Sequence, residues 1–143
     1  MRRPSLLDYL SLMAAMDEAR QKLTGVWNLL DYADRETVED PWTNTFGKDP
    51  CGVIGYHDNG LLHVQVYAQQ SGLEWTHVGY IGHFSVREAQ RMNGLIVGVL
   101  EHHMKVAFPA ELLGEDPARP FRLEGNYLTL GDGETARRTF ERV

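Results

Sequence analysis

The sequence predicts a mainly β protein, a single antiparallel β-barrel of about eight strands that follows one N-terminal α-helix. The chain has 143 residues, which suits one domain. A helical pattern occupies residues 5–23, and after Gly25 short runs of β-branched and aromatic residues alternate with turn signals. Consecutive strands with no helix between them favour an antiparallel meander. Closing this sheet into a barrel removes its exposed edge strands. A half-open sheet packed on the helix is the competing architecture.

The helix is predicted over residues 5–23, and we expect it to close one end of the barrel. Ser5 can serve as the N-cap, Asp8 lies three residues later as in a capping box, and Gly25 ends the pattern. Six apolar residues recur at steps of three and four and mark one helix face: Leu6, Leu7, Leu10, Met13, Ala14 and Met16.

Eight strands are predicted from the runs that follow, and short turns join several of them. Asp58-Asn59-Gly60 and Asp132-Gly133 are hairpin signals, and Glu124-Gly125-Asn126 gives another short reversal. Residues 34–50 and 109–118 are predicted as longer loops. The strands are expected near residues 25–33, 51–57, 61–68, 77–87, 95–107, 119–124, 126–131 and 135–142.

Charge and cysteine content exclude several classes of function. The formal net charge is -6 and the basic residues are scattered, which argues against a nucleic-acid partner. Cys51 is the single cysteine, so an internal disulfide is impossible, a thiolate zinc site is disfavoured, and an inert thiol is the favoured interpretation. No signal-peptide or membrane-span pattern follows the N-terminus. We therefore expect a cytoplasmic setting without a membrane partner.

His102 is the strongest candidate for chemistry. Alternation along residues 100–108 places Leu100, His102, Met104, Val106 and Phe108 on one apolar face, and Glu101, His103 and Lys105 on the wet face. A histidine on an inward face is either hydrogen-bonded for packing or contacts a ligand and moves a proton, and both interpretations stay open. His102 and His103 point to opposite faces and cannot chelate one ion together, so no metal is expected.

Two tyrosines complete the predicted constellation. Tyr80 shares a face with Phe84 and Val86, a set that forms either core or the wall of a pocket. Tyr56 supplies a second hydroxyl group. In the strand near 61–68, the favoured interior face is Leu62, Val64, Val66 and Ala68, and the opposite face is the alternative. Trp42 and Trp75 lie in or beside loops and are expected at the rim of the opening.

Several segments, taken together and in order, resemble the small lipocalin-like domain family of the calycin group. They are Gly25-Val26-Trp27, the stretch 47–56, Tyr80 with Gly82 and Phe84, His102 with Phe108-Pro109, the stretch 119–130, and Glu141-Arg142. The resemblance covers residues 23–143. It implies a barrel domain at 24–143 after a helical extension at 1–23, a cavity for small hydrophobic molecules, and Arg142 packed on Trp27 at one end.

Three functions are compatible with these residues. The first is a cofactor-independent enzyme of secondary metabolism, a cyclase, isomerase or dehydratase acting on a small, largely apolar or polyketide-like metabolite. Its catalytic residues would be His102, Tyr80 and Tyr56. The second is a carrier for the same kind of ligand, and the third is an interaction domain with a filled barrel. A homodimer is compatible with each. The ligand contacts are expected from Trp27, Phe84, Met104, Leu100, Val64 and Val66.

Overall fold

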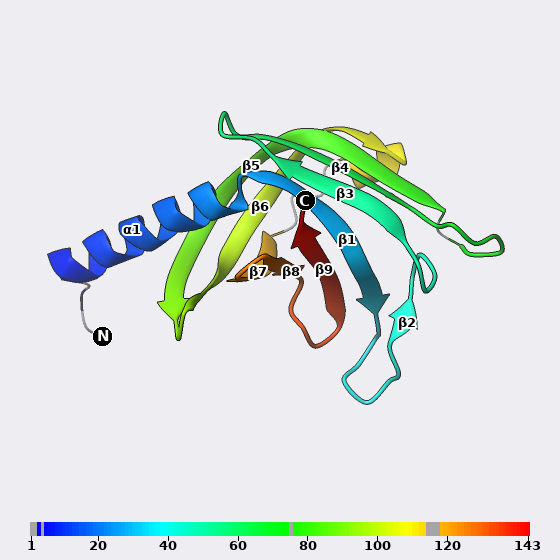
Figure 1. Ribbon diagram of the computed structural model, residues 1–143, viewed down its shortest axis with the longest axis horizontal. Helices are drawn as coiled ribbons and strands as arrows, with labels where there is room; N and C mark the ends of the chain where they lie inside the picture. Colours follow the sequence, from blue (N-terminus) through cyan, green and yellow to red (C-terminus); the bar gives the residue numbers. More distant parts are fainter. Residues whose placement is uncertain (1–2, 4, 75, 114–117) are drawn as a thin grey trace.

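The computed structural model describes residues 3, 5–74, 76–113 and 118–143. Trp75, expected at the rim of the opening, lies outside these residues. The described part contains one α-helix, nine strands and a short 3₁₀ helix (Figure 1). The elements are α1 (Leu6–Leu23), β1 (Gly25–Asp34), β2 (Thr43–Asn44), β3 (Cys51–Tyr56), β4 (Leu61–Tyr67), β5 (His77–Met92), β6 (Leu95–Phe108), η1 (Ala110–Leu112), β7 (Ala118–Glu124), β8 (Tyr127–Leu130) and β9 (Ala136–Arg142).

The strands form one antiparallel barrel. The order β1-β3-β4-β5-β6-β7-β8-β9 is closed by pairing of β9 with β1, from Trp27 opposite Arg142 to Asp34 opposite Ala136, with a register shift of one residue between Leu29 and Asp31. This closure confirms the predicted fold class and excludes the half-open sheet. The eight predicted strands are all present, and β5 extends further than predicted, to Met92. The short strand β2, which pairs with the end of β1, was not predicted.

The turn residues act as their chemistry predicts. Gly60 adopts a φ of 89° in the β3–β4 turn, where Asn59 Oδ1 accepts the N–H of Leu61 at 3.1 Å. In the β8–β9 turn, the Asp132 carboxylate accepts hydrogen bonds from the hydroxyl and N–H groups of Thr135 and from neighbouring backbone N–H groups. These hydrogen bonds hold the pKa of Asp132 well below its usual value. Local chemistry therefore fixes both reversals.

The helix forms as predicted, but it buries a different face. Ser5 caps it and the capping box with Asp8 is complete. The residues that pack on the barrel are Ala15, Ala19 and Leu23, at i, i+4 and i+8. The face predicted from the larger apolar residues is instead exposed over the first turns, and Figure 1 shows these turns extending away from the barrel. The alanines explain the choice, because small side chains let the helix approach β5 closely. Only the C-terminal part of α1 closes the barrel end.

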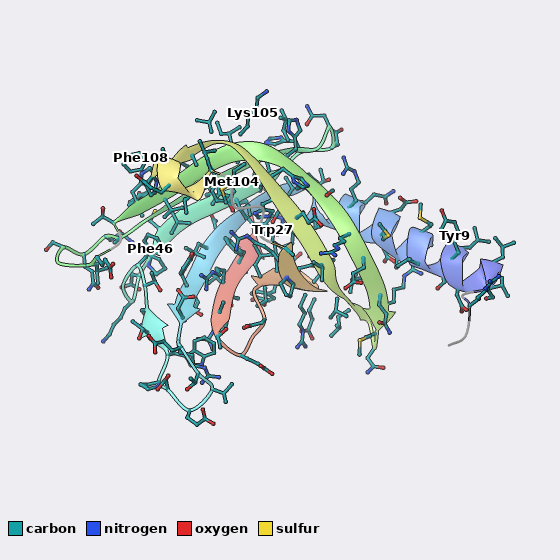
Figure 2. The ribbon with its side chains drawn as sticks, turned by 180° about the vertical axis from the view of Figure 1, so that it is seen from behind. Tyr9, Trp27, Phe46, Met104, Lys105 and Phe108 are labelled. Atoms are coloured by element: carbon teal, nitrogen blue, oxygen red, sulfur yellow. The ribbon has the colours of Figure 1, made fainter. Side chains whose placement is uncertain are left out.

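A bulge in β6 corrects the predicted orientation of Val106 and Phe108. Ile81 pairs with Val106 but Gly82 pairs with Met104, so Lys105 is an extra residue. Val106 and Phe108 therefore point outward, 62% and 61% exposed, while Met104 stays inside (Figure 2). Gly82 makes the bulge possible, because a Cβ there would lie 1.9 Å from the His103 carbonyl oxygen.

The end of the barrel near α1 is filled by large side chains. Trp27 is completely buried, and its Nε1–H donates to the Leu23 carbonyl oxygen at 2.9 Å. The Arg142 guanidinium lies 4.2 Å from the centre of the indole ring, which confirms the expected pair. Arg142 also donates to the backbone carbonyls of Thr24 and Lys22, so the pair joins the last turn of α1 to the barrel. In the described part of the chain, no helix combines the length and apolar character needed to cross a bilayer.

Candidate functional site

The barrel brings Tyr56, Tyr80 and His102 together. Tyr56 is the last residue of β3, Tyr80 lies in β5 and His102 lies in β6, within four consecutive neighbours of the sheet. Each side chain points inward, as alternation predicts for Tyr80 and His102. The register places His102 opposite Phe84, and the Phe84 ring meets the Tyr56 ring edge-on at 4.8 Å. The curvature of the closed sheet then bridges the distance between β3 and β6.

His102 is completely buried and hydrogen-bonded at both ring nitrogens. Its Nε2 lies 2.8 Å from the Tyr56 hydroxyl oxygen, and its Nδ1 lies 2.8 Å from the Tyr80 hydroxyl oxygen. Both tyrosines are themselves buried. The neighbouring His103 points outward and lies 3.4 Å from Glu101, so the two adjacent histidines face opposite sides as expected. The three inward residues form a linear chain of two hydrogen bonds.

Burial sets the protonation states of this chain. It lowers the pKa of His102 well below the ordinary value, and the positive charge of Arg119 adds to the effect. Burial also raises the pKa of Tyr56 well above 10, and that of Tyr80 less strongly because Arg119 opposes the shift. At neutral pH the imidazole and both phenols are therefore uncharged.

The pattern of partners assigns the tautomer of His102. Among the described residues, Tyr56 has no hydrogen-bond partner other than His102, so its buried O–H has to donate to Nε2. Nδ1 then carries the hydrogen of the neutral ring and donates to the Tyr80 oxygen. The Arg119 guanidinium also lines the cavity with Tyr80, and its positive charge opposes the rise in the pKa of Tyr80. The Tyr80 oxygen thus accepts the hydrogen bond from His102, and among the described residues its own O–H remains free to donate.

The other end of the barrel holds a cavity of about 280 Å³ into which Tyr80 faces. Tyr56 and His102 lie behind Tyr80 and do not line it. Of the predicted contact residues, Val64, Val66 and Met104 line the cavity, whereas Trp27, Phe84 and Leu100 belong to the packed end. The lining consists of Tyr32, Asp34, Thr45, Phe46, Ile54, Val64, Val66, Val78, Tyr80, Met104, Leu112, Arg119, Leu130, Arg138 and Phe140.

Arg119 is the important site residue that was not predicted. It begins the inward face of β7, where Phe121 and Leu123 are buried, and it reaches the cavity beside Tyr80. No carboxylate pairs with Arg119 in the part of the chain that the structure describes. A cavity-facing guanidinium without a counter-ion favours a ligand oxygen as its partner. The signal was present in the sequence, because Arg119 is a polar residue on an apolar strand face, as His102 is.

A second cation at the cavity is already compensated. Arg138 lies 2.8 Å from the Asp34 carboxylate, donates to the Ala33 carbonyl oxygen and covers the Tyr32 ring at 3.9 Å. Asp34 also accepts the Thr45 hydroxyl at 2.5 Å. The charges and hydrogen-bonding groups of Arg138, Asp34 and Thr45 are therefore paired with one another at the mouth of the cavity. Arg119 and Tyr80 are therefore the polar groups best placed to meet a ligand.

Comparison of the chain with known protein families, with curated proteins and with solved structures finds no match. The residues that the structure describes contain no cluster of three or more histidine, cysteine, aspartate or glutamate side chains that could hold a metal ion. The site is thus defined by the geometry around Tyr80.

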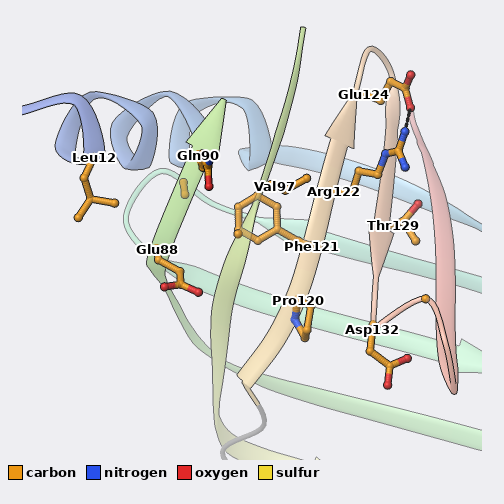
Figure 3. Close-up of a pocket in the computed structure, with 14 residues that line it drawn as sticks. Leu12, Glu88, Gln90, Val97, Pro120, Phe121, Arg122, Glu124, Thr129 and Asp132 are labelled. Atoms are coloured by element: carbon orange, nitrogen blue, oxygen red, sulfur yellow. Dashed lines mark hydrogen bonds and ion pairs between the residues drawn. The ribbon is translucent and has the colours of Figure 1, made fainter. Parts of the chain in front are cut away.

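A larger hollow of about 710 Å³ lies beside α1 and carries different chemistry (Figure 3). Its wall includes the side chains of Glu88, Arg122, Glu124 and Asp132, and Arg122 and Glu124 form an ion pair across 3.0 Å. None of the predicted site residues lines this hollow. The smaller barrel cavity is therefore the better candidate site.

We expect the protein to lose stability in acid through His102. The folded-state pKa of His102 is depressed, so the unfolded chain takes up the proton first once the pH falls below about 6.5. The stabilisation is present above that pH and is lost as the pH falls below it, by at most about 1.4 kcal/mol per pH unit. The matched control, Tyr56→Phe with His102→Leu, removes both partners of one hydrogen bond and leaves no buried orphan there. In urea unfolding, the free energy of unfolding of this variant should fall less steeply with decreasing pH than that of the wild-type protein. An equally steep fall in both proteins would contradict the assignment of the acid effect to His102.

Proposed function

We propose that the protein binds a small, largely apolar molecule with one oxygen function and acts on it by proton transfer, without a cofactor. The reaction class is an isomerisation, a cyclisation or a dehydration. The observation that carries the proposal is the free Tyr80 O–H, which is held beside Arg119 at a cavity whose other charged groups, Asp34 and Arg138, are paired with each other. An O–H and a guanidinium that point to one place are suited to bind a carbonyl, hydroxyl or carboxylate oxygen.

The hydrogen-bond chain gives Tyr80 a chemical role. When negative charge develops on the ligand oxygen, the Tyr80 O–H can donate its hydrogen bond or its proton. The Tyr80 oxygen would then keep the Nδ1–H of His102 as a donor, and the positive charge of Arg119 would favour negative charge on it. Tyr80 is thus the proposed catalytic residue. His102 and Tyr56 are proposed as positioning residues, because neither lines the cavity.

The dimensions of the cavity support a small substrate. Its volume of about 280 Å³ is near the lower end of the range for ligand pockets, roughly 300–1,000 Å³. The walls from Val64, Val66, Met104 and Leu130 favour a hydrocarbon body. Confinement would hold a flexible substrate in few conformations, which lowers the entropic part of a cyclisation barrier. An empty space of this size argues against an interaction domain with a filled barrel.

A carrier is the second candidate. The observation in its favour is that His102 has hydrogen bonds at both nitrogens and is separated from the cavity, as a structural histidine would be. The same donors, Tyr80 and Arg119, would then hold a ligand without turnover. Membership of the lipocalin-like family, with a barrel domain at 24–143 and a helical extension at 1–23, remains part of the proposal and is compatible with both functions.

Turnover separates the two candidates. The purified protein, far below stoichiometric amounts, is incubated with a small-molecule extract of the cells that produce it, followed by chromatography with mass detection. The enzyme predicts a compound that changes retention at constant mass, or loses water, in an amount far above that of the protein. Loss of one compound only in proportion to the added protein would support the carrier. No change in any compound would contradict both.

A further inference from the structure

The first turns of α1 present an apolar surface that the barrel does not cover. Figure 2 shows this end of the helix, with Tyr9, reaching away from the barrel. Leu6 is 72% exposed and Leu10 is 53% exposed, and Leu7 and Met13 are exposed as well. Contiguous apolar surface of this kind marks an interaction site in a folded protein. A helix of 18 residues whose first half is exposed is also marginal by itself.

The exposed stripe is opposite the buried one. At about 100° per residue, Leu6, Leu10 and Met13 lie on one side of α1, whereas Ala15 and Ala19 face the barrel. The Asp17 carboxylate lies on the exposed stripe, one turn beyond Met13. A partner could therefore pack along α1 without displacing the barrel.

Charge selects the occupant. Residues 5–19 contain the carboxylates Asp8, Asp17 and Glu18 and no lysine or arginine, whereas helices that lie in membrane surfaces carry basic residues on their polar face. Arg3 lies just before the helix. When two copies of α1 pack antiparallel and cross at Leu10, Arg3 of one copy meets Asp17 of the other. Neither residue has an ion-pair partner among the described residues, so the surface is complementary to itself.

We propose that a second copy of this chain occupies the stripe, giving a two-fold dimer in which the α1 helices pack antiparallel and cross at Leu10. The crossing places Leu7 against Met13 of the partner at both ends of the contact, with the Arg3–Asp17 pairs outside it. Two-fold contacts of this kind use the same patch on both subunits. The two barrels then lie at opposite ends of the helix pair, and both cavities stay open.

Sedimentation equilibrium tests the dimer. The wild-type protein should have twice the mass of the 16.2 kDa chain, and Leu10→Glu should have the mass of one chain with unchanged circular dichroism of the barrel. The matched control is Val106→Glu, which places the same charge on an exposed apolar residue of β6 and should leave the dimer intact. Asp17→Arg should weaken the dimer at least tenfold, and adding Arg3→Glu should restore it.

Cross-linking tests the antiparallel arrangement. In a Cys51→Ser background, Leu10→Cys should form a disulfide between two copies under mild oxidation, because this position faces itself. Leu6→Cys should not, since an antiparallel pair separates the two copies of this residue by about 12 Å along the helix. Cross-linking of both would overturn the proposed arrangement. A wild-type monomer at every concentration would overturn the dimer, and a monomer that sediments with phosphatidylglycerol vesicles would assign the stripe to a membrane surface instead.

Discussion

Tyr80→Phe should abolish most of the turnover while leaving the barrel folded. The substitution removes one hydroxyl from the cavity wall, and this hydroxyl is the only donor of the Tyr56–His102–Tyr80 chain that a ligand can reach. Loss of a general acid or of a donor to developing negative charge lowers rates by about 10²–10⁴-fold. The quantity to measure is kcat/KM on the compound that the extract experiment identifies.

The matched control for this prediction is Tyr127→Phe. Tyr127 is about half exposed at the start of β8 and makes no hydrogen bond through its hydroxyl in the described structure. Its removal should leave kcat/KM unchanged. The fold should survive Tyr80→Phe, because water in the cavity can accept the Nδ1–H of His102. Equal activity of both variants would remove Tyr80 from the mechanism and favour the carrier.

Trp27→Ala should lower the free energy of unfolding by about 3–5 kcal/mol, which is the largest loss of stability that we expect from a single substitution. The indole ring is completely buried, and its loss leaves a cavity that the surrounding strands cannot fill. It also leaves the Leu23 carbonyl oxygen without the Nε1–H donor and removes the ring beneath Arg142. Urea unfolding followed by circular dichroism measures the difference.

Trp42→Ala is the control for Trp27→Ala. Trp42 is a half-buried loop residue that also meets guanidinium groups, at 4.1 Å from Arg35 and 4.5 Å from Arg137. Its removal opens no internal cavity, so it should cost clearly less. If the two variants are equally stable, cation–aromatic contact rather than burial would be the main contribution of Trp27.

Local signals were sufficient to predict the barrel. Turn residues such as Asn59-Gly60 and Asp132-Gly133 set the ends of the strands, and alternation placed Tyr80 and His102 on inward faces. Alternation predicts which face of the sheet a side chain lies on, but not how far apart side chains on different strands are. That Tyr56 in β3 reaches His102 in β6 depends on closure, which is a property of the whole barrel.

Two predictions failed because they depend on partners that periodicity does not describe. The apolar spacing in α1 correctly identifies a stripe through Leu6 and Leu10, but the barrel packs on Ala15 and Ala19 instead. Alternation along β6 fails after Met104, since the bulge arises from the pairing with β5. Arg119 was missed for another reason. It lies two residues before Phe121 in β7, so alternation places both on the same inward face, but this argument was not applied to Arg119.

The single inserted residue Lys105 has a consequence for how such a barrel could change its contents. Side chains on a strand alternate with a period of two, so pairing Lys105 in the ladder opposite Ile81, instead of leaving it bulged, would exchange the two faces of the strand beyond it. Ala107 would turn outward, and Val106 and Phe108 would turn toward the interior, where a valine and a phenyl ring would take up much of the empty space. The bulge at Lys105 therefore helps to keep the inside hollow. The free volume of the cavity is thus governed by the pairing register of β6 at one residue as much as by the identity of its lining.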